Sequence, residues 1–170
     1  DYNGMIPVTI SDTGVTKTVA ADSSNWYSYE NKEWANAILV TSDSRRKYLG
    51  TDGVTVTPTD ILAYYVWIPR YSYKMNGTET SISIAFNETP SGYIVHPAFT
   101  FGNQELTGIW VGKFETSGDA TTPTVLPDVQ SLRSQNVSTQ FKTSLKFSGG
   151  TLTDGVVTYS GNDTYGLSNT

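Results

Sequence analysis

The chain has 170 residues, a formal net charge of −5 and no cysteine, and a chain of this length can bury a core without disulfides. The lack of cysteine excludes disulfides, thiolate metal sites and cysteine nucleophiles, and a single histidine, His96, excludes a metal site built from several histidines. The acidic balance and the absence of a basic run argue against nucleic-acid binding, and no apolar stretch reaches the roughly 18 residues of a membrane span.

The remaining composition is typical of secreted β proteins. Serine and threonine together account for 43 residues, only 16% of the residues are charged, and there are 11 tyrosines. Threonine and tyrosine favour half-exposed pleated surfaces, and the many glycines and asparagines favour turns. We therefore expect an extracellular protein, at a cell surface or on a virion, with an ordinary cytosolic β domain as the alternative. The chain begins at Asp1 without methionine, as expected of a mature or trimmed product.

The first expected strand is Met5–Ile10, and Pro7 suggests that it lies at the edge of a sheet. Proline cannot donate to a strand ladder, so it is confined mostly to edges. An unpaired edge is a template for another chain, which makes this segment the predicted place of assembly. The candidate assembly edge consists of Met5, Ile6, Val8 and Ile10.

Two hairpins are expected next. Ser11–Ala21 is polar and has a turn signal, Asp-Thr-Gly, near its start. In the second hairpin, an aromatic strand, Trp26–Tyr29, and an apolar run, Trp34–Thr41, flank a charged turn at residues 30–33. Ser42–Leu49 is polar and basic and is consistent with a short helical turn.

The middle of the chain holds the strongest strand signals. Ile61–Pro69 is the longest apolar run, and Pro69 ends it. Ser81–Phe86 alternates between polar and apolar residues, as a strand with one buried face does. Tyr93–Phe101 is expected to be extended, and Gly108–Thr116 alternates again.

The best helical pattern lies in Val129–Phe147, where Val137, Phe141 and Leu145 recur at intervals of four residues. Asn136 or Ser138 is a suitable N-cap, and two glycines end the helix. A hairpin with an Asp-Gly turn follows over residues 151–159.

These elements predict an α+β fold, mostly antiparallel β with one main helix. We expect a single extracellular β-rich domain over residues 1–160 and a loose C-terminal tail over residues 161–170. Its core is expected to combine the apolar runs with the helix stripe. The predicted core segments are Ile61–Ile68, Ile109–Phe114 and the helix residues Val137, Phe141 and Leu145.

Several sequence blocks resemble a family of bacterial surface and prophage proteins, some of them with pilin-like or signal-type N-terminal segments. The blocks read NGMIPV, NWYSYENKEWANAILV, YYVWIPRYSYKM, HPAFTFGNQELTGIWVGKFETSG and YGLS. The order of Val66–Pro69, the His96 block and Ile109–Thr116 is also distantly similar to the C-type-lectin-like fold of the formylglycine-generating-enzyme superfamily. This similarity implies a partial or divergent lectin-like fold. The copper-binding cysteines of that enzyme are absent, so its oxidase activity is not implied.

No constellation with catalytic chemistry is apparent. His96 has no partner at a local spacing, so a structural ring bonded to a backbone carbonyl is the better interpretation. Lys113 and Glu115 share one face of a strand and are read as a structural ion pair. No nucleophile elbow, phosphate loop or calcium-loop spacing occurs. We therefore predict no catalytic residue, no cofactor and no metal, and hence no enzyme.

Clustered aromatic side chains are the remaining signal. Such clusters can stack on sugar rings or fill a protein interface, and they can equally form a core. The candidate ligand or interface aromatics are Trp26, Tyr27, Tyr29, Trp34, Tyr71 and Tyr73. The four N-x-S/T sequons, whose glycosylation the sequence leaves open, are at Asn76, Asn87, Asn136 and Asn162.

The first functional hypothesis is a non-enzymatic extracellular structural or adhesive module, the exposed part of a pilin-like filament subunit or a surface adhesin. Its partners would be copies of itself or neighbouring subunits. The alternative is a phage receptor-binding or carbohydrate-binding module that recognises a glycan or host-surface ligand.

Overall fold

The computed structural model describes residues 4–77 and 81–159, and its contacts divide the chain into two compact units. Of the described residues, 4–66 and 112–159 belong to the first unit, and 67–77 and 81–111 belong to the second. The structure is mostly antiparallel β with two helices, which confirms the α+β class. Within the range that the sequence analysis treats as one domain, the chain thus forms two units. The expected tail, residues 161–170, lies outside the described residues.

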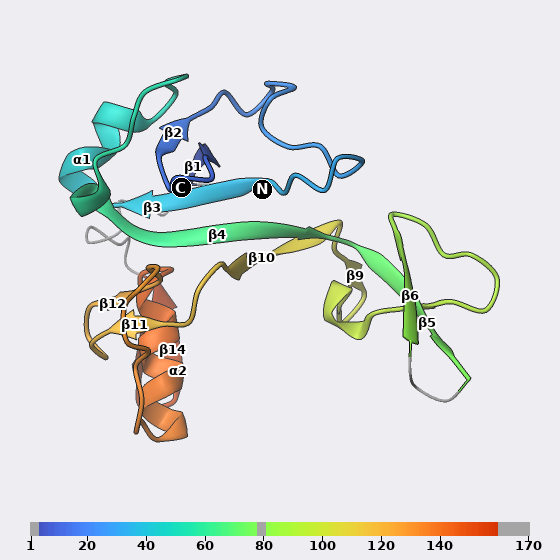
Figure 1. Cartoon of the computed structure of the whole chain (residues 1–170). Helices are drawn as coiled ribbons and strands as arrows, with labels where there is room; N and C mark the ends of the chain where they lie inside the picture. Colours follow the sequence, from blue (N-terminus) through green and yellow to red (C-terminus); the bar gives the residue numbers. More distant parts are fainter. Residues whose placement is uncertain (1–3, 78–80, 160–170) are drawn as a thin grey trace. The chain divides into compact units, whose positions relative to one another are not determined.

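The main sheet has the strand order β10-β4-β3-β1-β2, and its strands β1, β2 and β3 and most of β4 belong to the first unit, whereas β10 except Gly112 falls within the second. Strand β3 pairs antiparallel with β1 on one side and with β4 on the other, and Figure 1 shows β3 and β4 side by side. The strands are β1 (Ile6–Ile10), β2 (Thr16–Thr18), β3 (Asn36–Val40), β4 (Ile61–Pro69) and β10 (Gly108–Gly112).

The predicted assembly edge is wrong, because β1 is an interior strand. It pairs with β3 on one side and with β2 on the other. The Pro7 carbonyl accepts a hydrogen bond from Val19, just beyond β2, at 3.0 Å. In an antiparallel strand the N–H and C=O of one residue point to the same side. The Pro7 carbonyl points toward β2, and therefore the missing N–H of Pro7 removes no hydrogen bond between β1 and β3. Ile6 and Val8 are buried, and Met5 and Ile10 are half-buried against the core.

The outer edge of β2 is covered as well. The Thr18 N–H donates to the Val54 carbonyl, and the Val56 N–H donates to the Thr16 carbonyl, both at 2.9 Å. Lys17 and Thr55 form an antiparallel bridge between these bonds. The chain segment around residues 53–56 therefore closes the side of the sheet where β1 was expected to be open.

The core of the first unit lies on both faces of β3. On one face, Ile38 and Val40 pack with Ile6 and Val8 of β1 and with Ile61 of β4. On the other face, three small or aliphatic side chains, Leu39, Ala63 and Val125, form a second buried cluster. Burial on both faces explains why Asn36–Val40 reads as a continuous apolar run instead of an alternating one.

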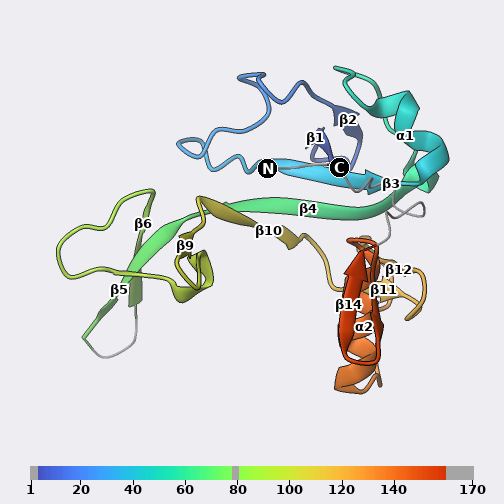
Figure 2. The ribbon, with the colours of Figure 1, turned by 180° about the vertical axis from the view of Figure 1, so that it is seen from behind.

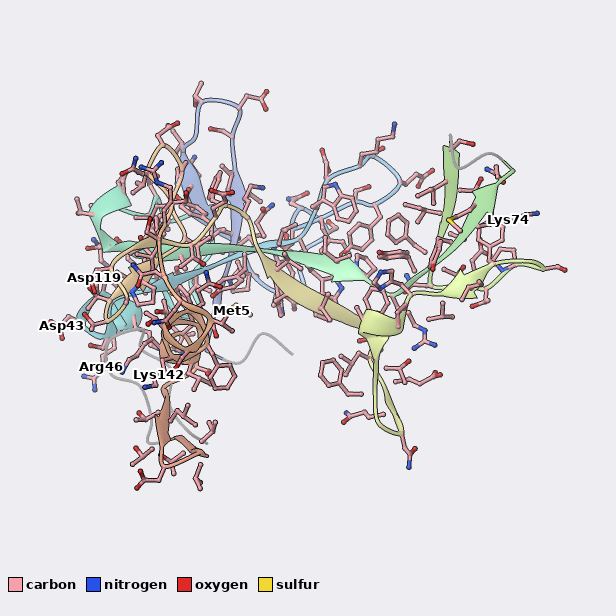
Figure 3. The ribbon with its side chains drawn as sticks, turned by 90° about the horizontal axis from the view of Figure 1, so that it is seen from below. Met5, Asp43, Arg46, Lys74, Asp119 and Lys142 are labelled. Carbon is pink, nitrogen blue, oxygen red and sulfur yellow. The ribbon has the colours of Figure 1, made fainter. Side chains whose placement is uncertain are left out.

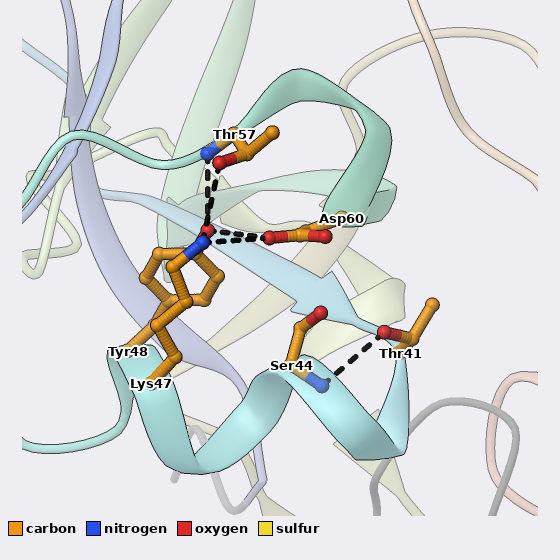
Figure 4. A network of polar contacts seen from close by, with 6 residues as sticks. All are labelled: Thr41, Ser44, Lys47, Tyr48, Thr57 and Asp60. Carbon is orange, nitrogen blue, oxygen red and sulfur yellow. Dashed lines mark hydrogen bonds and ion pairs between the residues drawn. The ribbon is translucent and has the colours of Figure 1, made fainter.

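Helix α1 (Ser42–Tyr48) confirms the helical turn expected after this run, and it joins the core through Tyr48, which is fully buried. Figure 4 shows the polar contacts that hold it. The Tyr48 hydroxyl donates to the Asp60 carboxylate at 2.5 Å and accepts the Thr57 N–H at 3.1 Å. The Lys47 ammonium lies 3.3 Å from the same Asp60 oxygen. Asp60 ends a short 3₁₀ turn, Pro58–Asp60, that leads directly into β4.

The predicted long helix is shorter than expected. Helix α2 (Val137–Lys146) begins after Asn136, whose side chain caps it by accepting the Thr139 N–H at 2.8 Å. The expected apolar stripe does not form part of the core: Val137 and Phe141 are 81% and 47% exposed. Thr143, about half a turn away from that stripe, is the buried helix residue and donates to the Ala120 carbonyl.

The hairpin expected after the helix is present. Strands β13 (Gly150–Thr153) and β14 (Val156–Tyr159) pair antiparallel around an Asp-Gly turn, and Figure 2 shows them beside α2. Two short strands that precede α2 in the chain, β11 (Ser117–Gly118) and β12 (Pro123–Thr124), also pair antiparallel. None of the helices in the described part of the chain is long and apolar enough to cross a membrane.

The second unit contains a three-stranded sheet of order β6-β5-β7. Gly108 lets the Trp67 ring pack directly against its backbone, since an added Cβ would lie 2.3 Å from that ring. The Trp67 and Trp110 rings meet edge to face at 5.3 Å. The strands are β5 (Tyr71–Asn76), β6 (Ser81–Phe86), β7 (Ile94–Val95), β8 (Thr100–Phe101) and β9 (Gln104–Glu105).

Candidate functional site

The lone histidine has the structural role that the sequence predicts, but with a different partner. The His96 Nδ1 atom accepts the Ala98 N–H at 3.2 Å and so caps the 3₁₀ turn Pro97–Phe99. A backbone carbonyl was expected in this place. The imidazole ring also lies 5.3 Å from the Tyr71 ring and 6.0 Å from the Tyr73 ring. These contacts fix the ring among aromatic neighbours.

The expected Lys113–Glu115 ion pair does not form. The Lys113 ammonium donates to the Asn36 Oδ1 atom at 2.7 Å, and partial burial lowers the pKa of Lys113. The ion pairs among the described residues are Lys47–Asp60 and Arg70–Glu105. Glu115 instead lines a groove of about 310 Å³ beside α2, in which it is the one ionisable side chain. The described residues also contain no cluster of three metal-ligating side chains.

The first group of candidate aromatics comes together in a loop, which we call the aromatic hairpin (Trp26–Trp34). Neighbouring rings contact each other in the order Trp26, Tyr27, Tyr29, Trp34, with centroids 5.0–5.7 Å apart. The expected strand pairing is wrong: one bridge, Ser28 to Glu33, closes the loop, and the following apolar run pairs with β1 and β4 instead. The run is buried on both faces, so it takes the central place in the sheet.

Only part of the aromatic hairpin is accessible. Trp26 is buried, and its Nε1 atom donates to the Asn36 carbonyl at 2.8 Å. Burial, with a smaller effect of the neighbouring Tyr27, raises the pKa of Tyr29 to about 12. Tyr29 and Trp34 are half-buried, whereas Tyr27 is 44% exposed. Tyr27 is thus the ring that a ligand can reach most easily.

The other two candidate aromatics, Tyr71 and Tyr73, lie on β5 in the second unit. Cross-strand partners point to the same face of an antiparallel sheet. Tyr71 is opposite Phe86, and Tyr73 is opposite Ile84 on β6 and Ile94 on β7. The register therefore gathers apolar side chains on one side, which we call the apolar face. The apolar face consists of Tyr71, Tyr73, Met75, Ile82, Ile84, Phe86 and Ile94.

Most of the apolar face is open to solvent. Met75, Ile82, Ile84 and Ile94 are each between 54% and 64% exposed. At the Tyr71 end, the rings of Phe86, His96 and the fully buried Phe99 pack around Tyr71 within 6.3 Å. The aliphatic side chains of the face thus lie beside an aromatic cluster whose geometry is already fixed.

The opposite face of the same sheet is polar and partly covered. Ser72 is fully buried, and its hydroxyl donates to the Glu88 carbonyl at 2.8 Å. The Asn76 amide donates to the Ser83 hydroxyl at 2.9 Å. Lys74 projects from this sheet in Figure 3, and its side chain lies along Gly92. On this face Ser72 is thus covered while Lys74, Asn76 and Ser81 are exposed, so both faces of the sheet carry exposed side chains.

The sequence contained a partial signal for this face. The alternation in Ser81–Phe86 predicts a strand with one apolar side, and the structure confirms the strand. Alternation does not show whether the apolar side meets a core or solvent. The sequence predicts a ligand or interface role for Tyr71 and Tyr73 of this face and gives no such prediction for its other five members.

No protein-family model, no curated protein and no solved structure matches this chain. The resemblance to bacterial surface and prophage proteins therefore stays an expectation. Any function must be argued from the exposed apolar face and the aromatic hairpin.

Proposed function

We propose that this protein is a non-enzymatic structural and adhesive module that binds neighbouring protein subunits through the apolar face. The observation that carries the proposal is the exposure of Met75, Ile82, Ile84 and Ile94 on one side of a single sheet. Contiguous apolar surface of this kind marks interaction sites on soluble proteins. Each such side chain contributes roughly 1.5–3 kcal/mol when it passes from full exposure to full burial, so four half-exposed ones supply a useful binding energy.

The composition and the sequence blocks support a position outside the cell for this module, as the exposed part of a pilin-like filament subunit or of a surface adhesin. A partial or divergent C-type-lectin-like fold belongs to the same proposal. The apolar face supports a protein partner over a glycan, because its four most exposed side chains are three isoleucines and a methionine, which carry no hydroxyl, amide or charged group for sugar hydroxyls.

A test replaces Ile94, the most exposed side chain of the face, by aspartate. The variant Ile94→Asp should be lost from the native surface fraction or virion in which the wild-type protein sediments. Val137→Asp is the matched control, because Val137 is also exposed but lies at the start of α2 in the other unit. Retention of Ile94→Asp at the wild-type level would contradict the proposal.

A carbohydrate-binding function is the second candidate, and the exposed ring of Tyr27 is the observation that favours it. Exposed aromatic rings stack on sugar faces. The expected result on a glycan array is a signal that Tyr27→Ala abolishes and Ile94→Asp leaves intact. An array without signal from the wild-type protein argues against this function.

A further inference from the structure

The groove beside α2 offers polar chemistry that neither the apolar face nor the aromatic hairpin uses. It has a volume of about 310 Å³, and all of its lining residues belong to the first unit. Helix α2 forms one wall, and residues 115–116 and 131–132 form the other. Figure 2 shows the neighbouring strands β11 and β12 beside α2. We call this hollow the α2 groove.

The wall opposite α2 is held by backbone pairing. The Leu132 N–H donates to the Thr116 carbonyl at 2.8 Å, and Ser117 forms an antiparallel bridge with Ser131. This pairing uses main-chain groups. It leaves the side chains of Glu115 and Ser131 without a hydrogen bond among the described residues.

The α2 wall presents hydrogen-bond acceptors, because its side-chain donors are used within the chain. The Ser144 hydroxyl donates to the Phe141 carbonyl at 2.8 Å. The Gln140 Nε2 atom donates to the Gln135 carbonyl at 3.3 Å. A carbonyl oxygen can only accept, so these bonds leave the side-chain oxygens of Ser144 and Gln140 as acceptors.

Glu115 adds a negative charge that has no ion-pair partner in the described part of the chain. The basic residues of α2, Lys142 and Lys146, line a separate hollow that shares only Thr143 with the α2 groove. A carboxylate accepts hydrogen bonds and donates none. The α2 groove thus combines one negative charge with acceptors from both walls.

We propose that the α2 groove binds a primary alkylammonium group, the chemical group of a lysine side chain and of small alkylamines. This inference goes beyond the proposed function, because the α2 groove and the apolar face belong to different units. An ammonium group has three N–H donors and no acceptor, which complements the oxygens of Glu115, Gln140 and Ser144. Leu132 lines the same groove and offers an aliphatic surface for the methylene groups of the ligand.

The size of the α2 groove favours an organic cation over a metal ion. Its volume falls within the range of roughly 300–1,000 Å³ for small-ligand pockets. A calcium ion needs about six to eight oxygen ligands, which are usually supplied by several carboxylates and carbonyls. Glu115 is the one carboxylate of the groove, and the described residues contain no group of three side chains that could hold a metal ion.

The test is a nuclear magnetic resonance titration of the isotopically labelled full chain with Nα-acetyl-lysine methylamide. The matched control, Nα-acetyl-norleucine methylamide, has the same side-chain carbons without the ammonium group. We expect the lysine probe alone to shift the amide signals of residues 115–117, 131–132 and 140–144. The expected dissociation constant is about 1 mM, because an exposed ion pair contributes little free energy. Equal shifts from both probes would overturn recognition of the ammonium group.

A charge-removing variant tests the role of Glu115. Glu115→Gln keeps the size of the side chain, and we expect it to raise the dissociation constant of the lysine probe about fivefold or more. The control Glu88→Gln removes the same charge from the second unit and should leave the constant unchanged. Circular dichroism confirms that both variants are folded. An equal effect of the two variants would show that the overall charge attracts the probe, which overturns the site.

Arg133 is the internal competitor for Glu115. It lines an adjoining hollow of about 390 Å³ that shares Ser131 and Leu132 with the α2 groove. We expect Arg133→Gln to change the dissociation constant of the lysine probe by less than about twofold. A wild-type chain that does not bind the probe, together with an Arg133→Gln variant that does, would show that Arg133 fills the groove. This result would overturn binding of an external ligand.

Two further titrations separate the sources of the ligand. Stronger binding of the lysine probe than of n-butylammonium supports a lysine side chain of a partner protein, and the reverse order supports a free alkylamine. Calcium chloride tests a metal ion in the same groove. Stronger shifts of the same signals with calcium than with either amine would overturn the inference.

Discussion

At the scale of single residues, Tyr48 shows how one polar atom can organise a core. Its ring is fully buried, and its hydroxyl is placed between the Asp60 carboxylate and the Thr57 N–H. A buried hydroxyl without partners would be destabilising, so the contacts allow the ring to enter the core. They also join α1 to the turn that starts β4.

Replacement of Tyr48 by phenylalanine should therefore destabilise the protein by about 1–2 kcal/mol, because the Thr57 N–H loses its acceptor and the Asp60 carboxylate loses its donor. Chemical denaturation followed by circular dichroism measures this change. The control Lys47→Met removes solvent-accessible contacts of the ammonium, which are the ion pair with Asp60, a hydrogen bond to the Thr57 hydroxyl and the contact with the Tyr48 ring, and it should change stability much less. An equal loss in both variants would contradict the assigned role of the hydroxyl.

The same network predicts a pH dependence. Hydrogen bonds from Tyr48, together with Ser44 and Lys47, lower the pKa of Asp60 below its ordinary value of 3.8. A carboxyl whose pKa is lower in the folded protein stabilises the fold above the unfolded pKa, and this stabilisation is lost as the pH falls through the folded pKa.

We therefore expect the unfolding free energy of the wild-type protein to fall more steeply below about pH 4 than that of Asp60→Asn. The two proteins are compared in denaturation experiments at a series of pH values. The comparison is needed because hydrogen bonds from Thr121 and Thr122 also lower the pKa of Asp119, and that effect is common to both proteins. Parallel pH profiles would show that Asp60 is not responsible.

At the scale of elements, the main sheet and helix α2 differ in how they are held. Strand β3 is buried on both faces, whereas the apolar stripe of α2 points largely to solvent. Helix α2 instead depends on its N-cap, Asn136, and on the buried hydroxyl of Thr143.

This difference predicts opposite results for two truncations. Ile38→Ala should cost about 2–5 kcal/mol, because Ile38 is fully buried and its removal leaves a cavity. Phe141→Ala should cost less than about 1 kcal/mol, because its ring is nearly half exposed. Thermal denaturation of both variants measures the contrast. A large loss in Phe141→Ala would restore the helix stripe as part of the core.

At the scale of the whole molecule, the two units have different relations to solvent. The first unit buries the apolar side chains of its sheet on both faces, and its β2 edge is covered by the segment around residues 53–56. The second unit leaves the apolar face of its sheet largely exposed.

Polar substitution on the apolar face should therefore change association and leave folding nearly intact. Ile82→Thr keeps a β-branched side chain at a position that is 60% exposed. We therefore expect the melting temperature of the protein, measured at low concentration, to change by no more than about 2 °C. Its binding of a dye for exposed apolar surface should decrease. A large loss of melting temperature would show that the free protein already buries Ile82.

The sequence by itself determined the class of the fold and most of the strands, because these depend on local features. Alternation predicts Ser81–Phe86, the apolar run and its terminal proline predict Ile61–Pro69, and the Asp-Gly turn predicts the last hairpin. The capping residue Asn136 is one of the two N-caps that the sequence predicts, since a cap depends on bonds within one turn.

Only the tertiary structure decided which strands are inside a sheet and which faces are buried. Pro7 suggested an edge, but partners distant in sequence, β2 and β3, enclose β1 on both sides. The alternation of β6 predicted an apolar side, but no local pattern can report that this side stays exposed. Burial depends on what packs against a strand, and that is set by residues far away in the chain.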